Sequence, residues 1–151
     1  MRRKEKEITD RAEIESIIRL ARVCRLAMCD GDMPYIVPMC FGFDGDTLYF
    51  HCAPEGRKLD IIRRNPNVCF EFDVDTELIP AEESCSIGMR YRSVMGSGTA
   101  SIVEDKADKA YSLDILVRQY ADRSTGFPQG MLERTTVFKV EIREMRGKRS
   151  G

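Results

Sequence analysis

The sequence lacks an excess of charge of either sign and any long apolar run, and both absences exclude classes of protein. Its 24 Lys and Arg residues nearly balance 25 Asp and Glu residues, so no bulk positive field is available to hold a nucleic acid. No apolar stretch approaches the ~20 residues that a membrane-spanning helix needs. We therefore expect one cytoplasmic domain, residues 1–151, with no nucleic-acid or membrane partner, and its length is sufficient for a real core.

The sequence also has few of the residues that build metal sites. It contains one histidine, His51, and no two of its six cysteines are spaced as C-x-x-C. Structural zinc sites normally use such pairs, so we expect no metal site. Without an export signal, the cysteines are expected to be free thiols. Cys40 and Cys52 bracket His51 and form a possible redox or metal cluster, but we favour core packing, since cysteine behaves as a small hydrophobe.

Hydrophobic periodicity predicts three helices and six strands. The helices cover residues 10–22, where Asp10 and Glu13 suggest a capping box, a short segment that begins near Gly56, and residues 106–120. The strands cover 23–29, 35–43, 47–52, 68–74, 90–103 and 135–142. Turn signals at residues 30–31 and 44–45 join the first three strands into an antiparallel meander, and Pro38 marks an interruption or an exposed edge. Residues 77–88 and 124–130 are expected to be loops, and the basic ends (2–4 and 146–149) solvated tails.

This order of elements predicts a mainly β, α+β fold. Six strands in mostly hairpin order, without βαβ alternation, favour a six-stranded antiparallel barrel with flanking helices. The sequence GSGTAS at Gly96 resembles a dinucleotide-binding fingerprint, but that motif requires a helix directly at the glycines. Residues 99–103 stay β-like, so the pattern argues against a Rossmann fold.

A candidate anion site lies where the strand TLYFHC leads into the second helix. The first turn of that helix carries Arg57 and Lys58. Free backbone N–H groups, the positive end of the helix dipole and two cations suit a phosphate. The alternative is that Arg57 and Lys58 are ordinary solvated helix residues.

The stretch LYFHCAPEGRKLDIIRRNPNVCFEFD, with VPMCFG before it and YRSVMGSGTA after it, resembles the pyridoxamine 5'-phosphate oxidase-like flavin-binding split-barrel superfamily. The similarity is to its 5-nitroimidazole-resistance (nitroimidazole reductase) branch, and its most specific part is the run of residues 51–58. It implies a split barrel that forms a homodimer, with a flavin, FMN or alternatively FAD, in each of two interface clefts.

The resemblance also implies which residues bind the cofactor. It places the flavin phosphate on Arg57 and Lys58 and the ribityl chain and ring beside Phe50 and His51. Ring contacts fall on the strand interrupted by proline, namely Val37, Pro38, Met39, Cys40 and Phe41. Polar contacts from a further strand fall on Arg92 and Ser93. An imidazole that titrates near neutrality is suited to donate a proton, so we expect His51 to be catalytic or to orient the substrate.

These features predict a flavin-dependent oxidoreductase. The expected electron donor is a reduced nicotinamide or another carrier, and the expected acceptor is a small organic molecule such as a nitroimidazole or nitroaromatic. True pyridoxamine-phosphate oxidase activity is disfavoured, because the chain has no tryptophan and lacks that enzyme's C-terminal Trp and Arg pattern. The alternative is a flavin or haem carrier or sensor on the same barrel, with His51 as a possible haem ligand.

Overall fold

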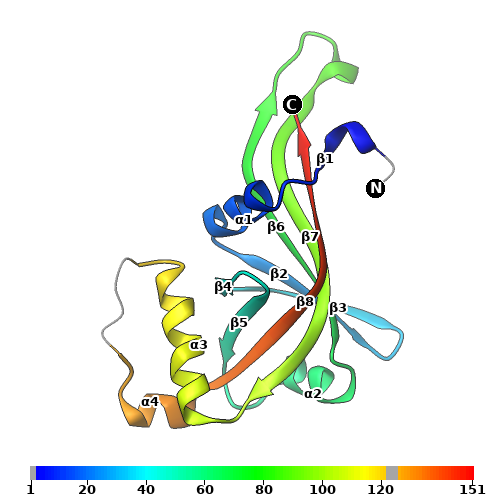
Figure 1. The fold of residues 1–151 in the computed structure, drawn as a ribbon. Coiled ribbons are helices and arrows are strands. Elements are labelled where there is room, and N and C mark those ends of the chain that lie inside the picture. Colours follow the sequence, from blue (N-terminus) through cyan, green and yellow to red (C-terminus); the bar gives the residue numbers. More distant parts are fainter. Residues whose placement is uncertain (1–2, 122–125) are drawn as a thin grey trace.

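The structure is a computed structural model that describes residues 3–121 and 126–151. Figure 1 shows a twisted sheet with helices packed around it. The strands are β1 (Glu7–Ile8), β2 (Cys24–Asp30), β3 (Met33–Met39), β4 (Gly42–Asp44), β5 (Thr47–Cys52), β6 (Asn67–Ile79), β7 (Gly88–Val103) and β8 (Thr136–Ser150). The α-helices are α1 (Arg11–Leu20), α2 (Arg57–Arg64), α3 (Lys106–Arg118) and α4 (Gln129–Arg134), and Lys4–Lys6 and Ser84–Ser86 form single 3-10 turns.

All strands join one antiparallel sheet. Its order is β3-β2-β6-β7-β8-β5-β4, and β1 pairs with β8 beside this path. The predicted mainly β fold with an antiparallel sheet and flanking helices is therefore confirmed. The sheet has eight strands rather than six, because β1 was not predicted and the predicted strand 35–43 is divided into β3 and β4.

The predicted three-stranded meander is wrong at this division. β3 pairs with β2 and β4 pairs with β5, so the two hairpins lie at opposite ends of the sheet. Phe41, between β3 and β4, is fully buried against Phe72, with ring centroids 4.7 Å apart. A Cβ at Gly42 would lie 2.6 Å from the backbone nitrogen of Leu116 in α3. Burial of Phe41 and the close approach of Gly42 to α3 thus take this segment out of the ladder, while exposed Pro38 lies on the edge strand β3 as predicted.

The main core lies on the inner face of the sheet. α1 covers part of it with Ile14, Ile17 and Ile18, and the Asp10 carboxylate accepts a hydrogen bond from the N–H of Ala12, which confirms Asp10 as the cap. The Glu13 carboxylate accepts a hydrogen bond from Arg149, so the predicted capping box is confirmed only in its Asp10 half. Aromatic rings fill much of the rest, and Phe50 stacks on Phe138 at 5.0 Å. A second, smaller cluster packs Val103, Leu113 and Val137 with Phe127 and Leu132, from around α3 and α4.

Several predicted boundaries need correction. The segment 77–88, predicted to be a loop, is partly strand: β6 and β7 continue past the rest of the sheet as a two-stranded arm, seen in green at the top of Figure 1. α4 lies in and after a stretch predicted to be a turn, of which residues 124–125 lie outside the described residues.

The predicted C-terminal tail is also wrong. Arg146, Lys148 and Arg149 belong to β8 and pair with β7, and β1 pairs with β8 on its other side, so this segment is held by ladders from two strands. Of the predicted N-terminal tail, Lys4 lies in a 3-10 turn, Arg3 precedes it and Arg2 lies outside the described residues.

At Gly96 and Gly98 the structure agrees with the sequence. β7 continues through both glycines to Val103, so no helix opens there, and the ladder with β8 shifts register between Ser97 and Gly98, as expected for a bulge. No helix in the described ranges combines the length and the apolar character needed to cross a bilayer.

Candidate functional site: the first turn of α2

α2 begins immediately after β5 and is fixed by its apolar face. Leu59, Ile61 and Ile62 are buried in the core, which leaves the first two residues, Arg57 and Lys58, at the surface end of the helix. The residue before the helix is Gly56, with φ of 144°, and no side chain caps the first turn. The helix therefore offers its first N–H groups and its positive dipole end next to two cations.

Arg57 is held by residues from the β2–β3 hairpin. Its Nε donates a hydrogen bond to Oδ2 of Asp30 at 3.1 Å, and its guanidinium carbon lies 4.7 Å from the centre of the Tyr35 ring. Arg64, the last residue of α2, donates from Nη2 to the other oxygen of Asp30 at 2.8 Å. One carboxylate thus lies between two guanidinium groups, so the three charged side chains together keep one positive charge.

Other cations of α2 extend this positive region. Lys58 is half-buried, and the Lys58 and Arg63 charges both act on the half-buried thiol of Cys52 at the end of β5. Burial nevertheless raises the pKa of Cys52, because desolvation outweighs the two cations. Cys52 therefore stays a neutral thiol near pH 7 and does not cancel the positive charge of the turn.

This donor set fits the phosphate end of a nucleotide-like cofactor. A phosphate dianion needs several donors and positive charge, and the turn supplies backbone N–H groups, an ammonium and a guanidinium. An added Cβ at Gly56 meets no atom within 4 Å, so the approach to the turn is open. The electrostatic expectation for Arg57 and Lys58 is thereby consistent with their geometry.

Comparison with known proteins identifies the family. Residues 10–149 match the family model described as pyridoxamine 5'-phosphate oxidase. The chain is 38% identical to a proposed 5-nitroimidazole antibiotic resistance protein from Bacteroides thetaiotaomicron, with a TM-score of 0.85 over 94% of this chain and 85% of that chain. The chain belongs to the pyridoxamine 5'-phosphate oxidase family.

Two further relatives extend the comparison. An FAD- and haem-binding protein from Mycobacterium smegmatis is 21% identical, with a TM-score of 0.85 over 96% of this chain and 73% of that one. An uncharacterised protein from Rhizobium meliloti (strain 1021) is 36% identical over 64 residues, which span 42% of each protein. The structural neighbours show that this member of the pyridoxamine 5'-phosphate oxidase family has the split-barrel fold.

The family member keeps two of the predicted ring-contact residues in its core. The side chains of Phe41 and Phe50 are fully buried. The N–H of Phe41 donates to the Tyr120 hydroxyl at 2.9 Å, and that hydroxyl donates to the carbonyl of Arg22. The Phe41 amide already has a hydrogen-bond partner within the protein, so it is not available to a flavin ring. A backbone group that has left its β-ladder is otherwise free to bond a ligand.

The remaining residues of that stretch differ in exposure. Pro38 and Cys40 are exposed, Val37 is half-buried, and Met39 is buried opposite Cys24. Because Cys40 is exposed, the expectation that it fills the core is wrong. All six cysteines are free, as predicted, and no group of three or more His, Cys, Asp or Glu residues in the described chain could hold a metal ion.

His51 points away from the α2 cations. It is exposed and pairs with Val137 across the β5–β8 ladder. Since side chains alternate along a strand, His51 shares a face with Tyr49, whereas Cys52, which feels Lys58 and Arg63, lies on the other face. No contact joins His51 to Arg57 or Lys58 in the described residues, and its role at a flavin stays a prediction.

Arg92 and Ser93 lie far from the α2 turn within the chain. Arg92 donates to Asp75 at 2.6 Å, and Ser93 is buried on β7 between Asp73 and Lys148. Met28, two residues before Asp30 in β2, is level with Gly98 through the pairs Met28–Val68 and Val68–Gly98. Gly98 and Ser93 are five residue steps apart along β7, or about 17 Å at 3.4 Å per residue. The structure therefore does not bring these two parts of the predicted site together in a single chain.

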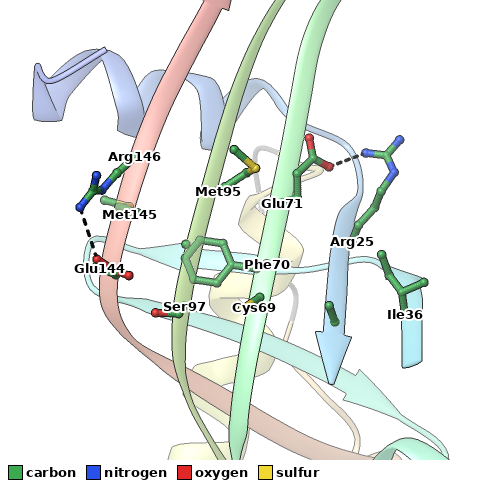
Figure 2. A pocket seen from close by; sticks show the side chains of 12 residues that line it. Arg25, Ile36, Cys69, Phe70, Glu71, Met95, Ser97, Glu144, Met145 and Arg146 are labelled. Carbon is green, nitrogen blue, oxygen red and sulfur yellow. Dashed lines mark hydrogen bonds and ion pairs between the residues drawn. The ribbon is translucent and has the colours of Figure 1, made fainter. Parts of the chain in front are cut away.

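The outer face of the sheet carries a second feature that sequence reasoning missed. A cavity of about 460 Å³ opens there, shown in Figure 2. Two cross-strand rows line it: Arg25, Glu71, Met95 and Arg146 in one, and Ile36, Ala27, Cys69, Ser97 and Glu144 in the other. Apolar and small side chains occupy its centre, while Arg25 pairs with Glu71 and Arg146 with Glu144 at its margins.

Sequence reasoning identified Arg57 and Lys58 but not the residues that contact them. The patterns predicted Asp30 only as part of a turn and Tyr35 only as part of a strand. Their contacts with Arg57 depend on how α2 packs beside the β2–β3 hairpin. Asp30 lies 27 positions before Arg57 in the chain and Tyr35 lies 22 positions before it. The apolar outer face results from the cross-strand register, which the sequence patterns do not predict.

Proposed function

We propose that this protein is a flavin-dependent oxidoreductase that holds FMN non-covalently and reduces a small organic acceptor of the nitroimidazole or nitroaromatic type. The electron donor is a reduced nicotinamide or a similar carrier, and the setting is the cytoplasm. The observation that carries this proposal is the open first turn of α2, where Arg57 and Lys58 meet the helix N-terminus in a member of this family. FMN, when bound, supplies the electron transfer, and the protein supplies position, charge and a shaped cavity.

In this proposal the residues of the chain have separate tasks. Arg57 and Lys58 bind the phosphate, and Tyr35 supports the Arg57 guanidinium from below. His51 is exposed and therefore free to take and return a proton from solvent, and we assign it to the substrate side as proton donor or orienting group. FMN is favoured over FAD because the chain offers one clear phosphate site, although a relative of the same fold is described as binding FAD and haem.

We further propose that the protein acts as a homodimer through the outer face of its sheet. Ile36 and Met95 lie on that face and are 61% and 48% exposed, and Cys69 on the same face is also exposed. The Arg25–Glu71 and Arg146–Glu144 ion pairs flank them. An apolar centre with a charged margin is the usual composition of a subunit interface. In this proposal the second copy supplies the Arg92 and Ser93 that reach each α2 turn, because these residues lie too far from the turn of their own chain.

The direct test is the identity and chemistry of the bound compound. The purified protein should be yellow, release FMN on denaturation as judged by mass, and be bleached by NADH or NADPH and re-oxidised by a nitroimidazole. The His51→Gln variant should keep the flavin spectrum and lose most of its turnover. Full turnover in His51→Gln would remove His51 from the mechanism.

The alternative is a carrier or sensor without turnover. It rests on His51, the single histidine of the chain, as an axial ligand, and on the haem-binding relative. A sharp Soret band in place of flavin bands would support it. A colourless protein that binds neither compound would contradict both proposals.

A further inference from the structure

Asp30 occupies an unusual position beside the proposed phosphate site. It is the last residue of β2, and its two oxygens accept hydrogen bonds from the first and last residues of α2, Arg57 at 3.1 Å and Arg64 at 2.8 Å. The Asp30 side chain is only 24% exposed, whereas those of Arg57 and Arg64 are 53% and 65% exposed. A partly buried carboxylate thus fixes two long, otherwise solvent-exposed cations.

The contact uses only one edge of the Arg57 guanidinium. Asp30 accepts from Nε, and the Tyr35 ring covers the guanidinium at 4.7 Å. Within the described residues, Arg57 makes no other hydrogen bond or ion pair. Its two terminal nitrogens, the pair that binds phosphate in a bidentate manner, are therefore left free.

We propose that Asp30 is a positioning residue, which acts through Arg57 and holds the guanidinium ready for the flavin phosphate. This inference rests on the proposed function and names a determinant of its phosphate preference. Arginine has many rotamers, and ordering one on binding lowers affinity, so a side chain that is already ordered binds more tightly. Arg64 holds Asp30 from the other side and keeps it from following Arg57 toward the ligand.

A competing physical effect has the opposite sign. Asp30 is an anion near an anion site, and its removal would strengthen phosphate binding if long-range repulsion dominated. Arg57 and Arg64 both neutralise it at short range, and the site is open to solvent, where screening weakens longer-range terms. We therefore expect loss of positioning to outweigh the relief of repulsion.

The test measures dissociation constants for FMN and for riboflavin, which lacks the phosphate, by quenching of flavin fluorescence. In Asp30→Ala the affinity ratio of FMN over riboflavin should fall about threefold to tenfold, the range expected for ordering one long side chain. Riboflavin affinity should stay unchanged, which shows that the site is folded. Asp30→Asn keeps an acceptor for Nε and should restore part of the ratio, and Tyr35→Leu should lower it.

A double-mutant cycle separates positioning from a general structural effect. In an Arg57→Ala background, Asp30→Ala should have no further effect on the ratio, because Asp30 acts through Arg57. Asp114→Ala, which breaks the Arg118–Asp114 pair of 2.7 Å on α3, is the matched control and should change nothing. An unchanged or higher ratio in Asp30→Ala, or an effect that persists without Arg57, overturns the inference. If the wild type itself shows no preference for FMN, the proposed function fails first.

Discussion

Glu71 shows how one residue can link the outer face to pH. It lies on β6 beside the cavity and accepts a hydrogen bond from Arg25, which also contacts Asp73. Burial raises the pKa of Glu71 above its ordinary value of 4.5, and the neighbouring Asp73 raises it further, while Arg25 acts in the opposite direction. The native state therefore binds this proton more tightly than the unfolded chain does.

The sign of the pH effect follows directly. A raised native pKa adds stability that is complete below the unfolded pKa, near 4.5, and is lost as pH rises through the native value. The Glu71→Gln variant removes this dependence. The melting temperature of the wild type minus that of Glu71→Gln should increase as pH falls from 7 to 5, measured by thermal denaturation. A difference in melting temperature that stays constant or decreases as pH falls would show that burial does not disfavour the ionised form of Glu71.

At the residue scale, sequence reasoning located the charges that a motif places side by side. Arg57 and Lys58 are adjacent, so their positions needed no tertiary information. Asp30, Tyr35 and Glu71 acquire their roles from packing and strand register, which single-sequence patterns do not contain. The burial of Phe41 and Phe50 likewise depended on which face of the sheet became the inner one.

Strand β7 illustrates the element scale. Its two central glycines were predicted to permit a bend, and the ladder does shift register beside Gly98. Gly96 is required for a different reason, because a Cβ there would lie 2.3 Å from the Phe70 ring and 2.5 Å from the carbonyl of Glu144. The sequence identified both glycines but could not show what approaches them.

The Gly96→Ala variant should therefore be destabilised. Overpacking a core position typically costs about 1–3 kcal/mol, measured here by urea denaturation. Gly88→Ala in the same strand is the matched control, since its nearest neighbour would be 3.8 Å away and its φ is not positive. Equal stabilities for the two variants would contradict the packing described for Gly96.

The elements that sequence patterns found best are those with clear periodicity and local caps. α1 and β5 agree with their predicted ranges to within two residues at each end, and α2 begins at Arg57, one residue after the predicted start near Gly56. The division of residues 35–43 into β3 and β4 was missed, because it results from the contact of Gly42 with α3. The length of β8 was not predicted, because a basic C-terminal sequence is typical of a solvated tail. Pairing with β1 and β7 is what makes this segment a strand.

At the scale of the whole molecule, the proposed homodimer is the feature that one chain leaves open. A negative charge placed at the centre of the outer face should prevent association, because an unpaired charge is costly to bury. Met95→Asp should therefore give a monomer by light scattering and lose flavin. Met131→Asp on α4 is the control, because Met131 is 55% exposed and Met95 is 48% exposed, and this variant should remain dimeric. A wild type that is monomeric at all concentrations would remove the homodimer from the account.

The central claim is that the first turn of α2 binds the phosphate of a flavin, and one titration tests it most directly. The wild-type protein, stripped of bound compounds, is titrated with FMN and with riboflavin. Two charge-assisted contacts predict that FMN binds at least about a hundredfold more tightly, and that Arg57→Ala combined with Lys58→Ala abolishes this preference while Arg118→Ala keeps it. Equal affinities of the wild type for the two compounds would contradict the claim.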